Sequence, residues 1–261
     1  MKFARYLDQF LTKRGRLIIS LVLVIAILIT LDAYARGRFE SEVMTSSEHF
    51  ELSGLATQQA QEVLNEMESS YDRIGRDLKA QPEALIRVYV YNNRWAYGRA
   101  TGHWGASGNI EGSKMIHILW VGEETGQVAI HEFAHTVTLQ LLIEHEPQPL
   151  DAAKFDEKFA SFPVWLWEGV AVYEANQAHN PMSFPYMKSG QYPSLQELSQ
   201  TSKGAKIYDV GYTLVEFIES KWGHDRLIQL ILEYGNAQKV LGVSDEQLSR
   251  LWSDFVRAKY Q

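Results

Sequence analysis

Two histidines and a glutamate lie within five residues in the segment QVAIHEFAHTVTLQLL, residues 127–142. On an α-helix, His131 and His135 leave the same face, because positions i and i+4 lie about 40° apart around the axis. Both rings can then reach one metal ion at about 2.0–2.1 Å. Glu132 is rotated by about 100° from His131, so it can reach a bound water without being a ligand. The spacing predicts a zinc centre with a neighbouring base.

The helix that carries these three residues is predicted to be buried. Apolar residues surround them in the sequence: Ala129, Ile130, Phe133, Ala134, Val137, Leu139, Leu141 and Leu142. Buried imidazoles and a buried carboxylate need partners, and one cation supplies a partner for all three. The alternative interpretation is a helix with two partly satisfied histidines near its surface.

A catalytic zinc site needs a third protein ligand and leaves one position for water. Glu168 stands out among the downstream acids because it lies in the segment FPVWLWEGVAVYEANQA, where an unpaired carboxylate is costly. Gly169 follows it and leaves space for another helix to approach. The alternative is an ordinary exposed residue on an amphipathic helix. The other acids considered are Glu144, Glu146, Glu157 and Glu174.

The motif HEFAH followed by PVWLWEGVAVYEA resembles the gluzincin metallopeptidases, and most closely their compact peptidase-MA-like members. The resemblance covers about residues 50–235. It implies an α+β, thermolysin-like catalytic fold with a small mixed sheet and the active-site helix in a first lobe and helices in a second. It also implies that His131, His135 and Glu168 hold one Zn²⁺ ion. Peptide bonds would be hydrolysed by zinc-activated water, with Glu132 as the general base.

The segment IYDVGYTLVEFI, residues 207–218, resembles the part of aminopeptidase N that supplies a tyrosine to the transition-state oxyanion. The matching residue is Tyr208, with Gly211 at the position of the glycine that follows it. Tyr212 is the local alternative. Both tyrosines could instead be packing residues, since aromatic residues at helical spacing usually are.

Residues Gly105, Ala106, Ser107, Gly108 and Asn109 lie where aminopeptidases of this type carry GxMEN, an edge strand that pairs with the peptide substrate. The glutamate that would bind a free α-amine is replaced by Gly108. The resemblance therefore favours an endopeptidase over an aminopeptidase. A simple glycine-rich hairpin is the alternative.

Hydrophobic periodicity predicts the elements that must position these residues. Strands are expected at about 49–52, 85–91, 104–110 and 115–121. Helices are expected at about 57–79, 125–144, 151–160, 163–177, 205–222, 225–234 and 245–259, with a short one starting at the capping box Ser194–Glu197. The expected domain, residues 48–261, thus has an α+β lobe over 48–146 and a helical lobe over 147–261.

The first 35 residues predict a membrane segment. Residues 17–31 carry no charge, and Lys13, Arg14 and Arg16 precede them, which places the N-terminus in the cytoplasm. Residues 17–35 are either an uncleaved transmembrane helix or a cleavable signal peptide. The expectation is a single-pass protein of the cell membrane, with a basic cytoplasmic segment (1–16), a stalk (36–47) and an extracytoplasmic catalytic domain, which would be secreted if the signal is cleaved.

Composition excludes several classes of partner and site. Residues 1–35 hold five basic and two acidic residues, so +3 of the net charge of −7 lies there and the remainder carries −10. An acidic body argues against nucleic acid as a partner, and the absence of cysteine excludes disulfides and thiolate ligands. The predicted partners are a peptide or protein substrate and, through residues 17–35, a membrane. The alternative function is a non-catalytic, membrane-tethered domain of the same fold that binds zinc or peptide.

Overall fold

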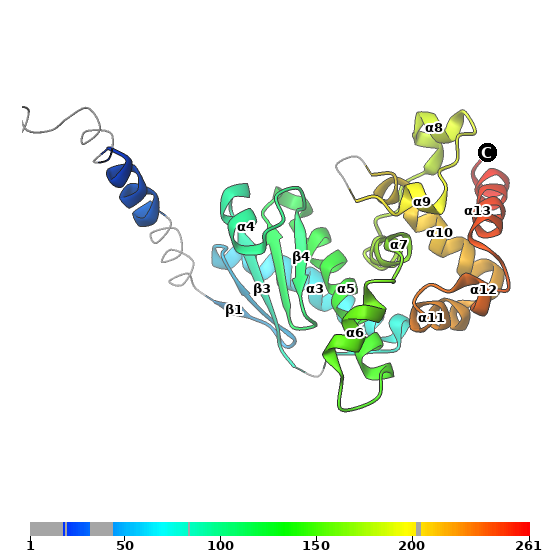
Figure 1. The fold of residues 1–261 in the computed structure, drawn as a ribbon, viewed down its shortest axis with the longest axis horizontal. Helices are drawn as coiled ribbons and strands as arrows, with labels where there is room; N and C mark the ends of the chain where they lie inside the picture. The colour runs from blue at the N-terminus through cyan, green and yellow to red at the C-terminus, as the bar shows by residue number, and fades with distance from the viewer. Residues whose placement is uncertain (1–17, 19, 32–43, 83, 202–204) are drawn as a thin grey trace, which may run out of the picture. The chain divides into compact units, whose positions relative to one another are not determined.

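The computed structural model of the 261-residue chain describes residues 18, 20–31, 44–82, 84–201 and 205–261 (Figure 1). The chain divides into two units, Met1–Val43 and Met44–Gln261. The second unit holds the sheet and every helix from residue 57 onward. Its folding places the predicted site.

The predicted transmembrane helix is contradicted by the structure. Of residues 17–35, positions 18 and 20–31 are described, and 20–31 are helical. Among the described residues no helix is both long and apolar enough to cross a membrane, a crossing that takes about 20 apolar residues. The predicted single-pass topology with an extracytoplasmic body rested on that helix, so this prediction is wrong, whereas the contact of residues 17–35 with a membrane stays a prediction. The predicted segment 1–16 and residues 36–43 of the predicted stalk lie outside the described residues.

The sheet has five strands in the order β1-β2-β3-β5-β4. The inner strands β2, β3 and β5 are parallel, and the two edge strands β1 and β4 are antiparallel to their neighbours. The strands are β1 (Thr45–Ser46), β2 (Phe50–Ser53), β3 (Ile86–Tyr91), β4 (Gly108–Glu111) and β5 (Met115–Leu119). This mixed sheet, together with the helices around it, confirms the predicted α+β class.

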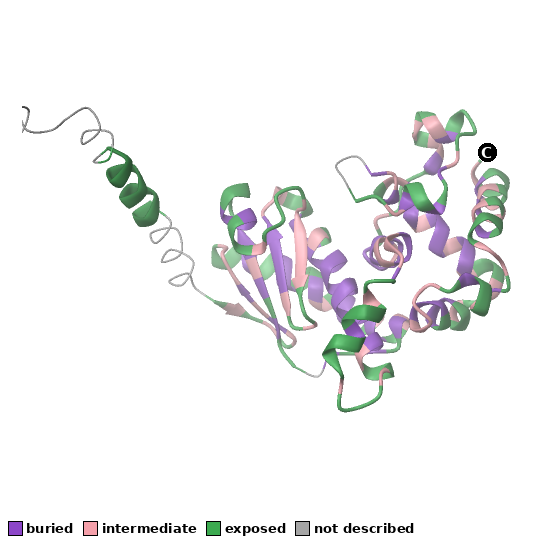
Figure 2. Cartoon of the chain, in the orientation of Figure 1, coloured by how far each residue is buried: buried purple, intermediate pink, exposed green. Residues whose placement is uncertain are grey.

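Two long helices, α3 (Thr57–Leu78) and α5 (Thr125–His145), pack against each other and against the sheet. The buried residues of α3 recur every three or four positions, from Ala60 to Leu78, as an amphipathic helix requires. Helix α5 is different, because it is buried over most of its circumference. Figure 2 shows buried residues on the strands, on α5 and on the central helices of the C-terminal part.

The second half of the domain is helical. Its helices are α6 (Ala152–Phe159), α7 (Val164–Glu174), α8 (Pro185–Lys188), α9 (Leu195–Leu198), α10 (Ile207–Trp222), α11 (His224–Leu232), α12 (Ala237–Val240) and α13 (Asp245–Tyr260). Helix α7 lies between α5 and α10 and packs on both. The contact between α7 and α10 is close at two glycines, since a Cβ added to Gly211 would lie 3.4 Å from Cα of Gly169. The space that Gly169 was expected to leave is therefore filled by α10.

The short helices α8 and α12 were not predicted, and neither was α4 (Arg94–Thr101). It starts at Asn93, whose side chain accepts a hydrogen bond of 2.8 Å from the backbone N–H of Ala96. Gly98 lies in its middle, where a Cβ would come within 2.4 Å of the Trp104 ring. This glycine serves packing and not a turn. Because the ring of Trp104 folds back on α4, the predicted strand begins at Gly108 instead of 104.

Candidate metal centre

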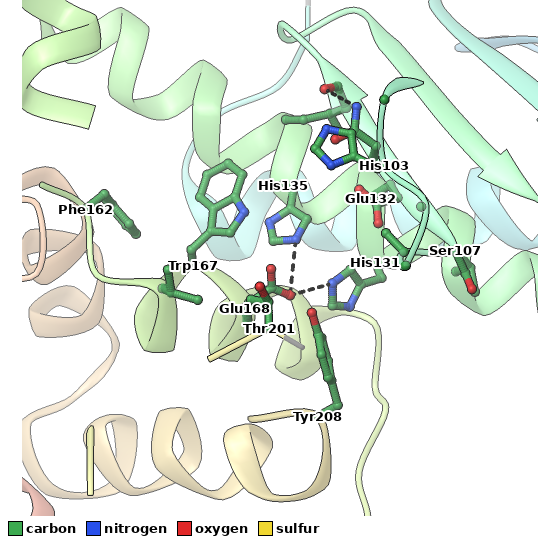
Figure 3. A pocket seen from close by; sticks show the side chains of 18 of the residues that line it. His103, Ser107, His131, Glu132, His135, Phe162, Trp167, Glu168, Thr201 and Tyr208 are labelled. Atoms are coloured by element: carbon green, nitrogen blue, oxygen red, sulfur yellow. Dashed lines mark hydrogen bonds and ion pairs between the residues drawn. The ribbon is translucent and has the colours of Figure 1, made fainter. Parts of the chain in front are cut away.

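The three predicted ligands come together between two helices. His131 and His135 project from α5, and Glu168 projects toward them from α7 (Figure 3). The Nε2 atom of His131 lies 3.3 Å from Oε2 of Glu168, and Nε2 of His135 lies 3.7 Å from the same oxygen. The ligand atoms of all three residues lie within 4.8 Å of one another, so this group could hold a metal ion.

The donor set fits a divalent ion. Two ligands at about 2.0–2.1 Å from a tetrahedral ion lie about 3.4 Å apart, which matches the separations of the Glu168 oxygen from both ring nitrogens. The side chains of His131, His135 and Glu168 are only 10%, 5% and 12% exposed. Two imidazoles and one carboxylate suit zinc and several other transition metals.

Electrostatics make the group receptive to positive charge. Burial would raise the pKa of Glu168, but hydrogen bonds with His131 and His135 outweigh it and hold the pKa well below the usual range of a glutamate. Burial lowers the pKa of His135. For His131 burial acts in the same direction, but the hydrogen bond with Glu168 and the charge of Glu132 raise its pKa overall.

Glu132 lies beside the ligands and is not one of them. Its side chain is buried, with 7% of the residue exposed, and burial raises its pKa to about 7. The carboxylate lies against β4, because a Cβ added to Gly108 would come within 2.2 Å of Oε1 of Glu132. Gly108 was singled out as the position that lacks a glutamate. The structure gives it a second property, since only a glycine leaves room here for the Glu132 side chain.

Tyr208 projects from α10 toward the ligands, with its hydroxyl directed at His131 and Glu168 (Figure 3). Its ring centroid lies 6.4 Å from that of His131. Burial of the hydroxyl, the charge of Glu168 and a hydrogen bond with Glu168 raise the pKa of Tyr208. The alternative residue, Tyr212, packs instead on Tyr173 at a centroid distance of 4.9 Å. Of the two tyrosines, Tyr208 is therefore the one at the site.

A cavity of about 1020 Å³ opens onto this centre. One wall consists of residues 102–110, which include the five predicted substrate-binding residues Gly105, Ala106, Ser107, Gly108 and Asn109. Only Gly108 and Asn109 of these belong to β4, and the other three form the loop before it.

The opposite wall of the cavity is aromatic and comes from α6, α7 and the turn between them. Trp167 stacks on the ring of His135, with centroids 4.3 Å apart and an interplanar angle of 12°. Phe159 and Phe162 meet the edge of Trp167 at 5.2 and 5.9 Å. Sequence reasoning identified Trp167 only as a candidate core residue. Its contact with His135 could not be predicted, because the two residues belong to segments that are distant in the chain. The wall would suit a large apolar side chain of a ligand.

Gln177 also contacts the centre and was missed. Its Oε1 atom lies 3.0 Å from Nδ1 of His131. The sequence offered one indirect signal, which is that a metal-binding histidine usually has a partner at its other ring nitrogen. Nothing in the spacing indicated that a glutamine beyond the end of α7 would supply it.

A scan against protein-family models finds no match, and comparisons with curated proteins and with solved structures return none either. The likeness to the gluzincins therefore depends on the motifs and on the arrangement of the site residues.

Proposed function

We propose that this chain is a zinc-dependent metallopeptidase of the gluzincin type that hydrolyses peptide bonds. One observation carries the proposal: Glu132 is buried beside the His131, His135 and Glu168 group and is not part of it. A site that only binds metal has no use for this fourth group, since burying an extra acid costs free energy. A hydrolase needs it as a base.

Zinc is the proposed ion because two histidines and a glutamate, with a cavity beside them, are the ligand set of a known class of catalytic zinc sites. Such a site keeps one position for water or substrate. A bound zinc ion would polarise the scissile carbonyl and lower the pKa of a water molecule toward about 7.

The residues of the chain then have separate tasks. Glu132 takes a proton from the attacking water and delivers it to the amine that leaves. Tyr208 donates a hydrogen bond from its hydroxyl to the oxygen that gains negative charge, a contribution worth about 10²–10³ in rate. Tyr208 is suited to this because its hydroxyl keeps its proton, with a pKa raised above the ordinary value.

The substrate is proposed to lie along β4 in an extended conformation. This strand is an edge of the sheet, paired on one side only, with β5. An extended peptide can add to such an edge by main-chain hydrogen bonds. Gly108 brings no carboxylate to bind a free α-amine, so cleavage within a chain is favoured over removal of its first residue.

The test is hydrolysis by the purified chain of a mixed peptide library, followed by mass spectrometry with and without a zinc chelator. Cleavage that the chelator abolishes and zinc restores is expected. Glu132→Gln should keep one zinc per chain and lose turnover by about 10²–10⁴ or more, the usual share of a general base. Glu144→Gln, an exposed change on the same helix α5, is the matched control. Zinc-loaded protein that cleaves no peptide, or an active Glu132→Gln variant, would contradict the proposal.

A further inference from the structure

His131 makes a hydrogen bond on the side of its ring away from the metal position. Its Nδ1 atom lies 3.0 Å from Oε1 of Gln177. An amide oxygen only accepts, so Nδ1 must carry the proton. A neutral ring protonated there has its free lone pair on Nε2, which is the atom 3.3 Å from Glu168. The contact therefore selects the tautomer that can bind a metal at Nε2.

The backbone holds Gln177 in place at the C-terminus of α7. Asn176 has a left-handed conformation with φ of 53°, and its N–H donates to the carbonyl of Tyr173 at 3.0 Å. The N–H of Gln177 donates to the carbonyl of Val172, also at 3.0 Å. These two bonds form a Schellman motif, with Asn176 as the left-handed residue. Helix α7 thus supplies both the ligand Glu168 and, through its cap, the partner of His131.

The two histidines are held in different ways. The Nδ1 atom of His135 is buried and has no hydrogen-bond partner within the described part of the chain. Its ring is instead oriented by stacking on Trp167. Within the described residues, the ring of His131 contacts His135 edge-on at a centroid distance of 4.8 Å and Tyr208 at 6.4 Å, and neither contact is a close parallel stack. Apart from its contact with Glu168 on the metal side, the ring of His131 is therefore held by Gln177.

We infer that Gln177 is a positioning residue, which fixes the tautomer and the ring orientation of His131 for metal binding. It acts through a neutral amide and adds no negative charge to the site. The inference rests on the proposed zinc centre but not on peptide hydrolysis. Gln177 is only partly buried, so its side chain can be replaced with little effect on folding.

The test is the zinc affinity of the whole chain, measured by competition with a chelator. Gln177→Met has nearly the same size but accepts no strong hydrogen bond, and it should raise the Kd for zinc by about 10- to 100-fold. Gln177→Glu keeps an acceptor at this position and should bind zinc at least as tightly as the wild type. Gln61→Met is the matched control, since Gln61 is exposed on α3 and its side chain donates a hydrogen bond to Asn65 on the same helix.

A second readout follows the proton itself. In the zinc-loaded wild type, the Nδ1–H proton of His131 should be visible by NMR and protected from exchange with water. In Gln177→Met it should exchange rapidly, and the absorption spectrum of the cobalt-substituted protein should change. If circular dichroism shows that Gln177→Met does not fold, Gln177→Asn replaces it, because shortening the side chain by one methylene withdraws the acceptor.

The outcomes separate the two proposals. Equal zinc affinity and equal proton exchange in wild type and Gln177→Met would overturn the role of Gln177 and leave the zinc centre standing. Weakened zinc binding without any peptide cleavage by the wild type would support Gln177 and contradict the peptidase. A wild type that binds no zinc would overturn both.

Discussion

At the scale of single residues, Glu132 and Gly108 form a pair whose two members depend on each other. The carboxylate of Glu132 occupies the space where any other residue at 108 would place its Cβ, 2.2 Å from Oε1. Contact with β4 therefore holds the Glu132 carboxylate, the proposed base, on the side of the site where the substrate is proposed to lie. Gly108 in the sequence therefore decides where the Glu132 carboxylate can lie.

Gly108→Ala is expected to displace the base while leaving the metal in place. The clash is with the end of a flexible side chain, so the free energy of unfolding should change by less than about 1 kcal/mol. Turnover should fall by about 10²-fold, the cost of misplacing a reacting group by about 1 Å. Kinetics, zinc content and denaturant unfolding measure the three effects.

A double-mutant cycle supplies the control. Adding Gly108→Ala to Glu132→Gln should cost little further activity, because the displaced group is already lost. If the two losses multiply, Gly108 acts independently of Glu132 and the steric account is wrong.

At the scale of elements, α7 is the piece that completes the site. It contributes Glu168, its cap presents Gln177, and Trp167 on the same helix stacks on His135. Helix α10, which contributes Tyr208, packs against α7. The glycine contact between Gly169 and Gly211 lets the two helices approach closely enough for Tyr208 and Glu168 to meet.

Gly211→Val should force α7 and α10 apart. A Cβ at this position already comes within 2.9 Å of the Ile207 side chain and 3.4 Å of Gly169, so a larger residue overpacks the interface. The free energy of unfolding should fall by about 1–3 kcal/mol, and turnover should fall with it as Tyr208 moves away. Chemical denaturation compares this variant with Lys221→Val, an exposed change on the same helix. Equal stability of the two variants would show that the interface tolerates the extra volume.

At the scale of the whole molecule, metal binding should join α5 to α7 and stabilise the fold. A ligand that binds only the native state adds about 2.7 kcal/mol at a free concentration of 100 times its Kd. Removing zinc with a chelator should therefore lower Tm by several degrees, and adding zinc back should restore it.

This stabilisation should decrease as the pH falls. Although burial opposes it, Glu168 and Glu132 raise the pKa of His131 in the metal-free protein, so the proton competes with the metal for Nε2. In the zinc-free protein the protonated His131 stabilises the fold below its unfolded pKa, and this contribution is lost as the pH rises through the folded pKa. The stabilisation by bound zinc has the opposite pH dependence, because it increases as the pH rises and the histidine ligands lose their protons. The difference in Tm between zinc-loaded and zinc-free protein should shrink from about pH 8 to about pH 6, and a constant difference would argue against histidine ligands.

Local signals in the sequence predict much of this arrangement. The i, i+4 spacing of His131 and His135 and the apolar setting of Glu168 could be read directly, since helical periodicity is a local property. The sheet order, the contact of Gln177 with His131 and the stacking of Trp167 could not be read in this way, because they join segments that are distant in the chain.

Helix α4 was missed because a glycine such as Gly98 normally weakens a helix. Here the packing of Trp104 against Gly98 outweighs the low helix propensity of glycine. The membrane helix was wrong because strong hydrophobicity was given more weight than the shortness of the apolar run.

The most direct test of the central claim is the zinc content of the purified chain when Glu168 is replaced. The account predicts one zinc per wild-type chain and a loss of zinc from Glu168→Ala, because that carboxylate is the ligand that α7 brings to the two histidines. Glu157→Ala, a change at an exposed acid on α6, should keep its zinc. Zinc bound equally well by Glu168→Ala and wild type would contradict the convergence of His131, His135 and Glu168 on one ion.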